Sequence, residues 1–215
     1  QSKSILKSLK NRVKLLPIIA LLITMLWSAC TTQKDGFSYR VFHNTTAKFN
    51  GFFYSKESMK EAHAILKENQ VEDYDEILPV FIYGDEETSK TVYSQMERTI
   101  EKSTNVIDRH KMDVSERNSK KMKRPVKNKW IDENYLLIGQ GYFYKKNYFK
   151  AEEFFLFVNR KYKEPLSQAR GFTWLARVYI EREEWIKANN NLIKAIQEKK
   201  VEDDEAKADM YLVYA

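Results

Sequence analysis

The sequence predicts an all-α protein, and three observations lead to that prediction. Its 215 residues include only 6 Gly and 4 Pro, whereas 43% are hydrophobic and 13% are aromatic. This composition supplies a core but too few turn formers for a sandwich or barrel of many short strands. Apolar residues also recur at helical spacing along much of the chain. Finally, one pattern of small and aromatic residues occurs twice, 37 residues apart.

The first 29 residues are expected to form a secretory signal peptide. Five basic residues and no acidic ones lie before Cys30, and thirteen apolar residues run from Leu15 to Trp27. A helix of that length, with a rise of about 1.5 Å per residue, reaches about 20 Å and falls short of the roughly 30 Å hydrocarbon core. A cleaved signal is therefore favoured over a membrane span.

Cys30 is the only cysteine and directly follows the small residues Ser28 and Ala29. This junction resembles the lipobox of bacterial lipoproteins, although Trp27 stands where an aliphatic residue is usual. The resemblance implies cleavage before Cys30, lipidation of its thiol, and a body held to the membrane through the acyl chains. A free or buried cysteine after an ordinary cleavage site or signal anchor remains the alternative.

The formal net charge of +7 comes from two local segments. One is the signal peptide, and the other is residues 110–129, which hold eight Lys or Arg against two acidic residues. The remaining residues contain more acids than bases. Because no basic face is expected on the folded body, nucleic acid is not expected as a partner. Residues 110–129 also lack apolar periodicity and read as a basic linker.

Helices are also predicted between the signal and this linker. One is expected from Phe37 to Tyr54 and another up to about Asn69, with an interruption at Ser55–Ser58. A third is expected to begin after Asp85, whose carboxylate would cap its N-terminus. Its buried side would carry Val92, Met96, Ile100 and Ile107.

The repeated pattern reads aromatic, two residues, aliphatic, small, two residues, Tyr. Its small residues are Gly139 and Ala176, and each is followed twelve residues later by an alanine, Ala151 or Ala188. This pattern resembles the tetratricopeptide repeat (TPR), a pair of antiparallel helices that approach closely at small residues. The resemblance implies an α-solenoid of TPR hairpins. A helical bundle with coincidental spacing remains the alternative.

The repeat register extends in both directions from these two copies. A weaker copy would place Asn50 and Ala62 at the small positions of an earlier hairpin, and Ala206 to Ala215 resembles the first helix of a further one. We therefore expect the N-terminal fragment of a longer chain. The expected organisation is a signal peptide (1–29), a lipidated tether (30–37), an N-terminal helical, degenerate TPR-like region (38–109), a basic linker (110–129) and TPR repeats (130–215), of which the third is truncated.

TPR hairpins stack so that the first helix of each pair lines a concave groove. In this sequence no Lys or Asn stands at the wall positions where the chaperone-tail family clamps a carboxylate, so that clamp is not expected. An aromatic and amphipathic groove instead suits a peptide or a partner helix. The expected groove residues are Glu133, Leu136, Gln140, Phe143, Tyr144, Arg170, Thr173, Arg177, Ile180 and Glu181.

No catalytic, metal-binding or cofactor-binding motif is recognisable. His43, His63 and His110 are scattered, and no nucleophile motif accompanies them. A multi-ligand zinc site is not expected with one cysteine and three histidines. We therefore expect no enzyme, no metal and no cofactor.

Three segments together resemble a narrower family. They are residues 42–54, 74–81 and 130–139, and with the lipobox they are similar to the SprE/PorW-type repeat lipoproteins of Bacteroidota. The resemblance implies an outer-membrane lipoprotein that faces the periplasm and contacts other proteins of type IX secretion and gliding motility. Two alternatives stay open: a SusD-like ligand-binding lipoprotein of nutrient uptake, and an envelope enzyme whose catalytic domain lies downstream.

Overall fold

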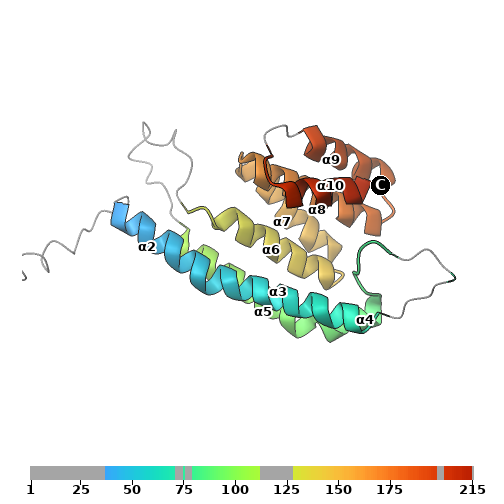
Figure 1. Ribbon diagram of the computed structural model, residues 1–215, viewed down its shortest axis with the longest axis horizontal. Coiled ribbons are helices and arrows are strands. Elements are labelled where there is room, and N and C mark those ends of the chain that lie inside the picture. The colour runs from blue at the N-terminus through green and yellow to red at the C-terminus, as the bar shows by residue number, and fades with distance from the viewer. Residues whose placement is uncertain (1–36, 71–74, 76–78, 112–127, 198–200, 215) are drawn as a thin grey trace, which may run out of the picture. The chain divides into compact units, whose positions relative to one another are not determined.

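The computed structural model describes residues 37–70, 75, 79–111, 128–197 and 201–214 (Figure 1). The chain divides into two units, residues 1–41 and 42–215, and the contacts discussed below lie within the second. All regular structure in the described residues is helical, which confirms the all-α prediction. Cys30, the signal peptide and residues 112–127 of the basic linker lie outside the described residues.

The helices follow one another along the chain, with long connections between α3 and α4 and between α5 and α6 and shorter ones from α6 onward (Figure 1). They are α2 (Phe37–Ala47), the π-helical turn η1 (Lys48–Phe52), α3 (Phe53–Glu68), α4 (Glu86–Thr91), α5 (Tyr93–His110), α6 (Ile131–Tyr144), α7 (Tyr148–Lys161), α8 (Pro165–Glu181), α9 (Trp185–Gln197) and α10 (Asp204–Tyr214).

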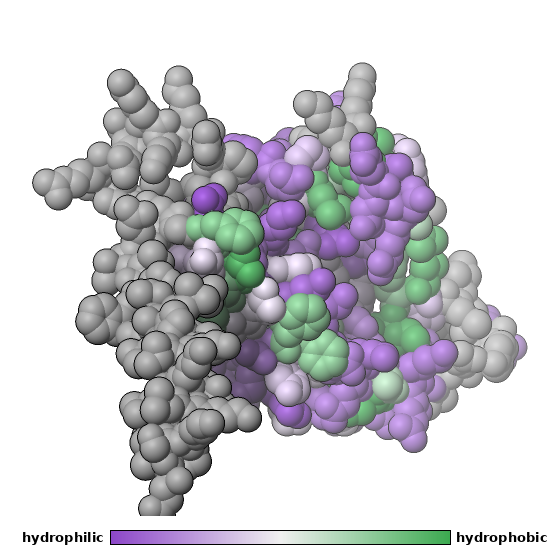
Figure 2. All heavy atoms as spheres, turned by 60° about the vertical axis from the view of Figure 1, so that its left-hand side comes forward, coloured by the Kyte–Doolittle hydropathy of each residue, from purple (hydrophilic) through white to green (hydrophobic). Residues whose placement is uncertain are grey.

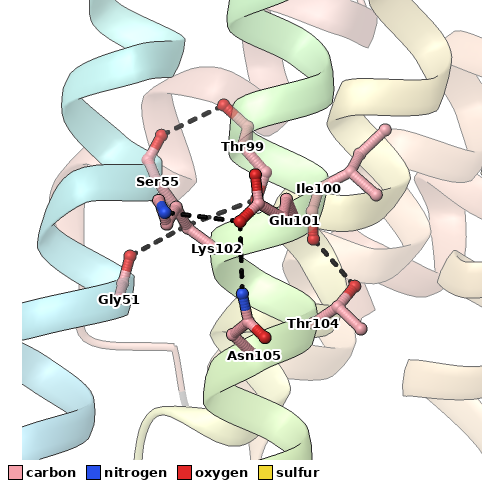
Figure 3. A network of polar contacts seen from close by, with 8 residues as sticks. All are labelled: Gly51, Ser55, Thr99, Ile100, Glu101, Lys102, Thr104 and Asn105. Carbon is pink, nitrogen blue, oxygen red and sulfur yellow. Dashed lines mark hydrogen bonds and ion pairs between the residues drawn. The ribbon is translucent and has the colours of Figure 1, made fainter.

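The predicted interruption at Ser55–Ser58 is wrong, because α3 runs through it. Ser55 is fully buried against α5, and its hydroxyl donates to the carbonyl of Gly51 at 2.9 Å. The same hydroxyl lies 3.3 Å from the carbonyl oxygen of Thr99 (Figure 3). It also accepts from the Ser103 hydroxyl at 2.9 Å. Serine can break helices by bonding to its own backbone, but here the small hydroxyls join two helices.

Helix α3 and η1 pack antiparallel to α5. Ser55 contacts Thr99, whereas Glu61, further along α3, accepts from the amide of Gln95 at 3.3 Å, earlier in α5. The earlier hairpin proposed around Asn50 and Ala62 is therefore wrong in register. Both residues lie on one continuous helical stretch with no turn between them, and the true partner of α3 is α5.

The start of the α4–α5 stretch is as predicted. The Asp85 carboxylate accepts from the backbone N–H of Thr88 at 2.7 Å, and this bond is the main reason that its pKa is lowered. Gly84 precedes it with a φ of 69°, a conformation that glycine adopts without strain. Of the apolar residues expected on the buried side, Val92, Met96 and Ile107 are buried and Ile100 is partly buried.

Helices α6 and α7 form one hairpin, and α8 and α9 form the next. A Cβ added at Gly139 would lie 2.5 Å from the ring of Phe155, so the two helices touch where the sequence has no side chain. Ala151 is fully buried in this hairpin, and Ala176 and Ala188 are buried in the next.

Both hairpins turn with the same backbone geometry. Lys146 and Glu183, which are 37 residues apart, have φ values of 58° and 59°. The N–H of the residue after each bonds to a carbonyl five residues earlier, at 2.9 Å in the first turn and 2.8 Å in the second. This is the Schellman arrangement, which ends a helix in the left-handed region. The 37-residue period is thus a repeat of structure as well as of sequence.

The first helices of successive hairpins run side by side in the same direction. Asp132 and Ser167 are hydrogen-bonded near the starts of α6 and α8, and the Arg170 guanidinium donates to Glu133 at 2.7 Å. Helix α10 repeats this relation to α8, since Arg170 lies 3.6 Å from Asp203 and Arg177 pairs with Asp209. In each of these pairs, the two residues are 32 to 37 positions apart in the sequence.

The contact between His43 on α2 and His110 at the end of α5 should make stability depend on pH. Their Nδ1 atoms lie 2.9 Å apart, so one nitrogen must donate and the other accept. Burial lowers the pKa of both below the usual 6.5, and for His110 the neighbouring His43 and Arg109 lower it further. The unfolded chain therefore binds more protons as the pH falls below about 6.5. We expect the free energy of unfolding to drop between about pH 7.5 and pH 5.5.

Urea unfolding of the wild type and of His110→Gln at several pH values checks this expectation. The variant loses one titrating partner, so its stability should fall less steeply on acidification. If the free energy of unfolding fell equally steeply with pH in the wild type and the variant, the histidine pair would not titrate as described.

Candidate partner-binding groove

A cavity of about 670 Å³ lies between four helices and one non-helical segment of the chain. Helices α3, α6, α8 and α10 contribute side chains to its walls, and residues 80–83 close one side. We call this cavity and its walls the groove. Two of the four helices, α6 and α8, are the first members of the two hairpins, and α10 packs against α8.

Aromatic rings form much of the lining. Phe52 and Trp130 lie with ring centroids 5.0 Å apart at one side of the groove. Tyr83 packs edge-on against Tyr144, with centroids 6.0 Å apart. Burial raises the pKa of Tyr144 to about 12, so its phenol is neutral at physiological pH. These rings offer flat apolar surface together with hydroxyl groups.

Arg177 provides the most buried charge in the described lining, with 5% of its side chain exposed. Its guanidinium lies between the rings of Phe81 and Trp174, 4.4 Å from each centroid. It also forms an ion pair with Asp209 of α10. The Nε atom of Arg177 is buried and has no hydrogen-bond partner among the described residues. This stacked cation therefore joins α8, α10 and the non-helical segment.

The remaining charges of the groove have both signs. The Arg170 guanidinium donates to Glu133 at 2.7 Å, and burial raises the pKa of Glu133 although Arg170 opposes the shift. Lys56 and Lys67 from α3 and Glu205 from α10 add exposed charges to the walls. A charged ligand, whether acidic or basic, could therefore be oriented by an ion pair with a wall residue of opposite charge.

The chain itself places a non-helical stretch along this groove. Residues 81–83 are not helical, and the rings of Phe81 and Tyr83 stack with centroids 5.7 Å apart and an interplanar angle of 4°. Phe81 covers Arg177, and Tyr83 meets the ring of Phe143 at 4.9 Å. The walls thus accommodate a non-helical backbone bearing aromatic side chains.

Five of the ten predicted groove residues line the cavity, and five do not. Leu136, Phe143 and Thr173 are buried within the helical packing, because they lie on the side of their helices that faces neighbouring helices. Ile180 and Glu181 are partly exposed but lie outside the lining. Glu181 instead accepts from the Tyr148 hydroxyl at 2.7 Å. The residues that do line the cavity are Glu133, Gln140, Tyr144, Arg170 and Arg177.

Sequence reasoning missed the walls that come from outside the repeats. The aromatic residues of segment 80–83 and the cavity-lining side chains of α3 do not stand at positions that the repeat pattern defines. The repeat spacing therefore could not identify them. One signal was available, because Phe81 and Tyr83 are large aromatic residues in a segment expected to be a loop. Such residues in a loop indicate that the loop packs against something.

Two further features bear on what the groove could do. Within the described residues, no three His, Cys, Asp or Glu side chains are grouped so that they could hold a metal ion. None of the described helices combines the length and the apolar character needed to cross a bilayer. No protein-family model matches the chain, and the search of curated proteins finds no match either.

Proposed function

We propose that the chain is a non-enzymatic TPR scaffold lipoprotein that binds a partner protein in the groove. The observation that carries the proposal is that the first helices α6 and α8 line one cavity whose walls already hold a non-helical, aromatic stretch of chain. A peptide-binding surface needs that combination of concave shape, exposed rings and charges of both signs.

The TPR assignment is supported by two features that recur at a 37-residue interval and by polar pairs between neighbouring first helices. Small residues occupy the contact within each hairpin, at Gly139 with Ala151 and at Ala176 with Ala188. The same left-handed turn residue ends the first helix of each hairpin. Polar pairs join each first helix to the next. A helical bundle with coincidental spacing would not be expected to repeat the turn geometry and the cross-hairpin pairs together.

The chemistry of the groove defines the class of partner. The stacked pair Phe81 and Tyr83 supports a partner segment that carries aromatic residues, because such rings already pack against these walls. Lys56 and Lys67 suit acidic groups on that segment, and Glu205 suits basic ones. The resemblance to SprE/PorW-type lipoproteins places the partner among the proteins of type IX secretion and gliding motility, at the periplasmic side of the outer membrane.

The proposed membrane anchor is tested by Cys30→Ser, with Thr32→Ser as the matched control in the same tether. Removing the thiol removes the site of acylation, and two or more acyl chains are what hold a soluble body stably to a membrane. We expect Cys30→Ser to move the protein out of the lipid-modified membrane fraction, and a strain that carries only this allele to secrete less cargo and glide less. Membrane fractionation, metabolic labelling with a fatty acid and a secretion assay measure these outcomes.

A strain with the whole gene deleted is the reference for this test. Loss of secreted cargo in the deletion, restored by the wild type and by Thr32→Ser, supports the proposed function. Normal secretion and gliding in the deletion would refute it.

A further inference from the structure

We propose that the exposed aromatic face of α2, η1 and α3 docks on the anionic surface of a lipid bilayer. We call this face, made by Phe42, Phe49 and Phe53, the aromatic stripe. This docking surface belongs to the folded body and is separate from the acyl anchor at Cys30. It is also independent of whether a partner occupies the groove.

The stripe exposes large apolar side chains on one side of the helical stretch. The exposed fractions are 61% for Phe42, 63% for Phe49 and 50% for Phe53. Phe49 follows Phe42 by seven residues and Phe53 follows by four more, which are spacings that share a helical face. The residues that pack toward α5 lie on another face, which includes the fully buried Ala47 and Ser55. On the face drawn in Figure 2, hydrophobic side chains are likewise exposed between hydrophilic ones.

The charges beside the stripe are mostly positive, and the exposed Glu57, four residues after Phe53, is an exception. No Asp or Glu occurs between Phe37 and Lys56, a stretch that holds Arg40, Lys48 and Lys56. The ammonium group of Lys48 lies 5.1 Å from the ring centroid of Phe49. Cations and exposed aromatic rings on one helix face are the combination that lies in the headgroup region of an anionic bilayer.

The end of α5 and the start of the next segment add further cations at the same helix. His110 contacts His43, and the backbone N–H of Lys129 donates to the Asn44 side chain at 2.9 Å. These two contacts place the charged residues near His110 and Lys129 beside the stripe. The exposed charged residues there are Arg109, Lys111 and Lys129, against Asp108.

This pattern favours a bilayer over a protein as the occupant. The groove, which we assign to a protein partner, mixes charges of both signs, whereas cations outnumber acids around the stripe. The stripe also lies close in sequence to Cys30, the proposed site of lipidation. Six residues lie between Cys30 and Phe37, so even a fully extended chain places these two residues no more than about 25 Å apart. A lipidated Cys30 would therefore keep the stripe within reach of the membrane surface.

A nitroxide spin label at position 45 tests the docking in the full chain. Cys30 is the only cysteine, so Cys30→Ser with Thr45→Cys leaves one labelling site. Thr45 is exposed and lies three residues after Phe42 and four before Phe49, so all three aromatic residues are retained. The control is Ile186→Cys in the same background, on α9, where the side chain is 80% exposed. Both proteins are mixed with vesicles of phosphatidylglycerol and phosphatidylcholine.

Collision rates with oxygen and with a water-soluble nickel complex report the depth of each label. We expect vesicles to lower the nickel accessibility at position 45 severalfold and to raise its oxygen accessibility, with no change at position 186. Replacing Phe42, Phe49 and Phe53 by Ser should abolish the change at position 45, and pure phosphatidylcholine should weaken it. An unchanged label at position 45, spin–spin broadening that shows contact between two copies, or equal depth on neutral vesicles would each overturn the proposal.

Discussion

Phe155→Ala is expected to lower the free energy of unfolding by about 3–5 kcal/mol and to reverse the sign of a second substitution, Gly139→Ala. Phe155 is fully buried, and its ring lies 5.8 Å from the ring of Trp174 in the next hairpin. Its removal therefore opens a cavity within one hairpin and at the junction with the next.

The sign reversal follows from the contact between Gly139 and Phe155. In the wild type, the Cβ of Gly139→Ala would lie 2.5 Å to 2.9 Å from three atoms of the ring. Overpacking of this kind costs about 1–3 kcal/mol, which exceeds or offsets the gain of about 1 kcal/mol in helix propensity. In the Phe155→Ala background the obstacle is absent, so Gly139→Ala should stabilise by about 1 kcal/mol.

Urea unfolding of the wild type, the two single variants and the double variant gives the coupling energy directly. Leu156→Ala, at the neighbouring position on α7 where the side chain is 37% exposed, is the matched control and should not couple to Gly139→Ala. Additive effects of Phe155→Ala and Gly139→Ala would mean that the two helices do not meet at this point.

Gln140→Trp is expected to reduce partner capture at the groove at least about tenfold, since about 1.4 kcal/mol corresponds to a factor of ten. Gln140 lies on α6, is partly exposed and lines the cavity. An indole at this position would occupy space that the partner segment needs while leaving the buried contacts of α6 unchanged. Leu156→Trp, on α7 and outside the cavity, adds the same side chain elsewhere and should bind normally.

A thermal unfolding scan separates blocking from misfolding. Both tryptophan variants should unfold within a few degrees of the wild type, because each side chain is added at a position that is at least partly exposed. A variant that binds poorly and also unfolds early would point to lost structure instead of a blocked groove.

Local patterns in the sequence were sufficient for most of the helices and for the contacts inside the hairpins. Asp85 was identified as a cap because its carboxylate acts within three residues, and the buried alanines Ala151 and Ala188 were identified because a helix fixes their spacing. Interactions of this range depend on the neighbouring sequence alone.

Features that depend on long-range packing were not predictable in the same way. Ser55 looked like a helix breaker because its partners, Thr99 and Ser103, are more than 40 residues away. The helical spacing around Phe42 and Phe49 predicted a helix but not which of its faces is buried, and both residues are exposed, since α5 packs on another side. Half of the predicted groove residues lie outside the cavity lining because neighbouring helices and segment 80–83 decide which faces remain open.

The central claim is that a partner segment lies in the groove, and site-specific photo-crosslinking in intact cells tests it most directly. A photoreactive residue is placed at Glu205, which is exposed and lines the cavity, or at Ile186, which is exposed on α9 outside it. We predict that position 205 captures a defined envelope protein, that Gln140→Trp in the same chain abolishes this capture, and that position 186 does not capture that protein. Capture of the same protein from both positions, or capture from position 205 that persists with Gln140→Trp, would contradict the account.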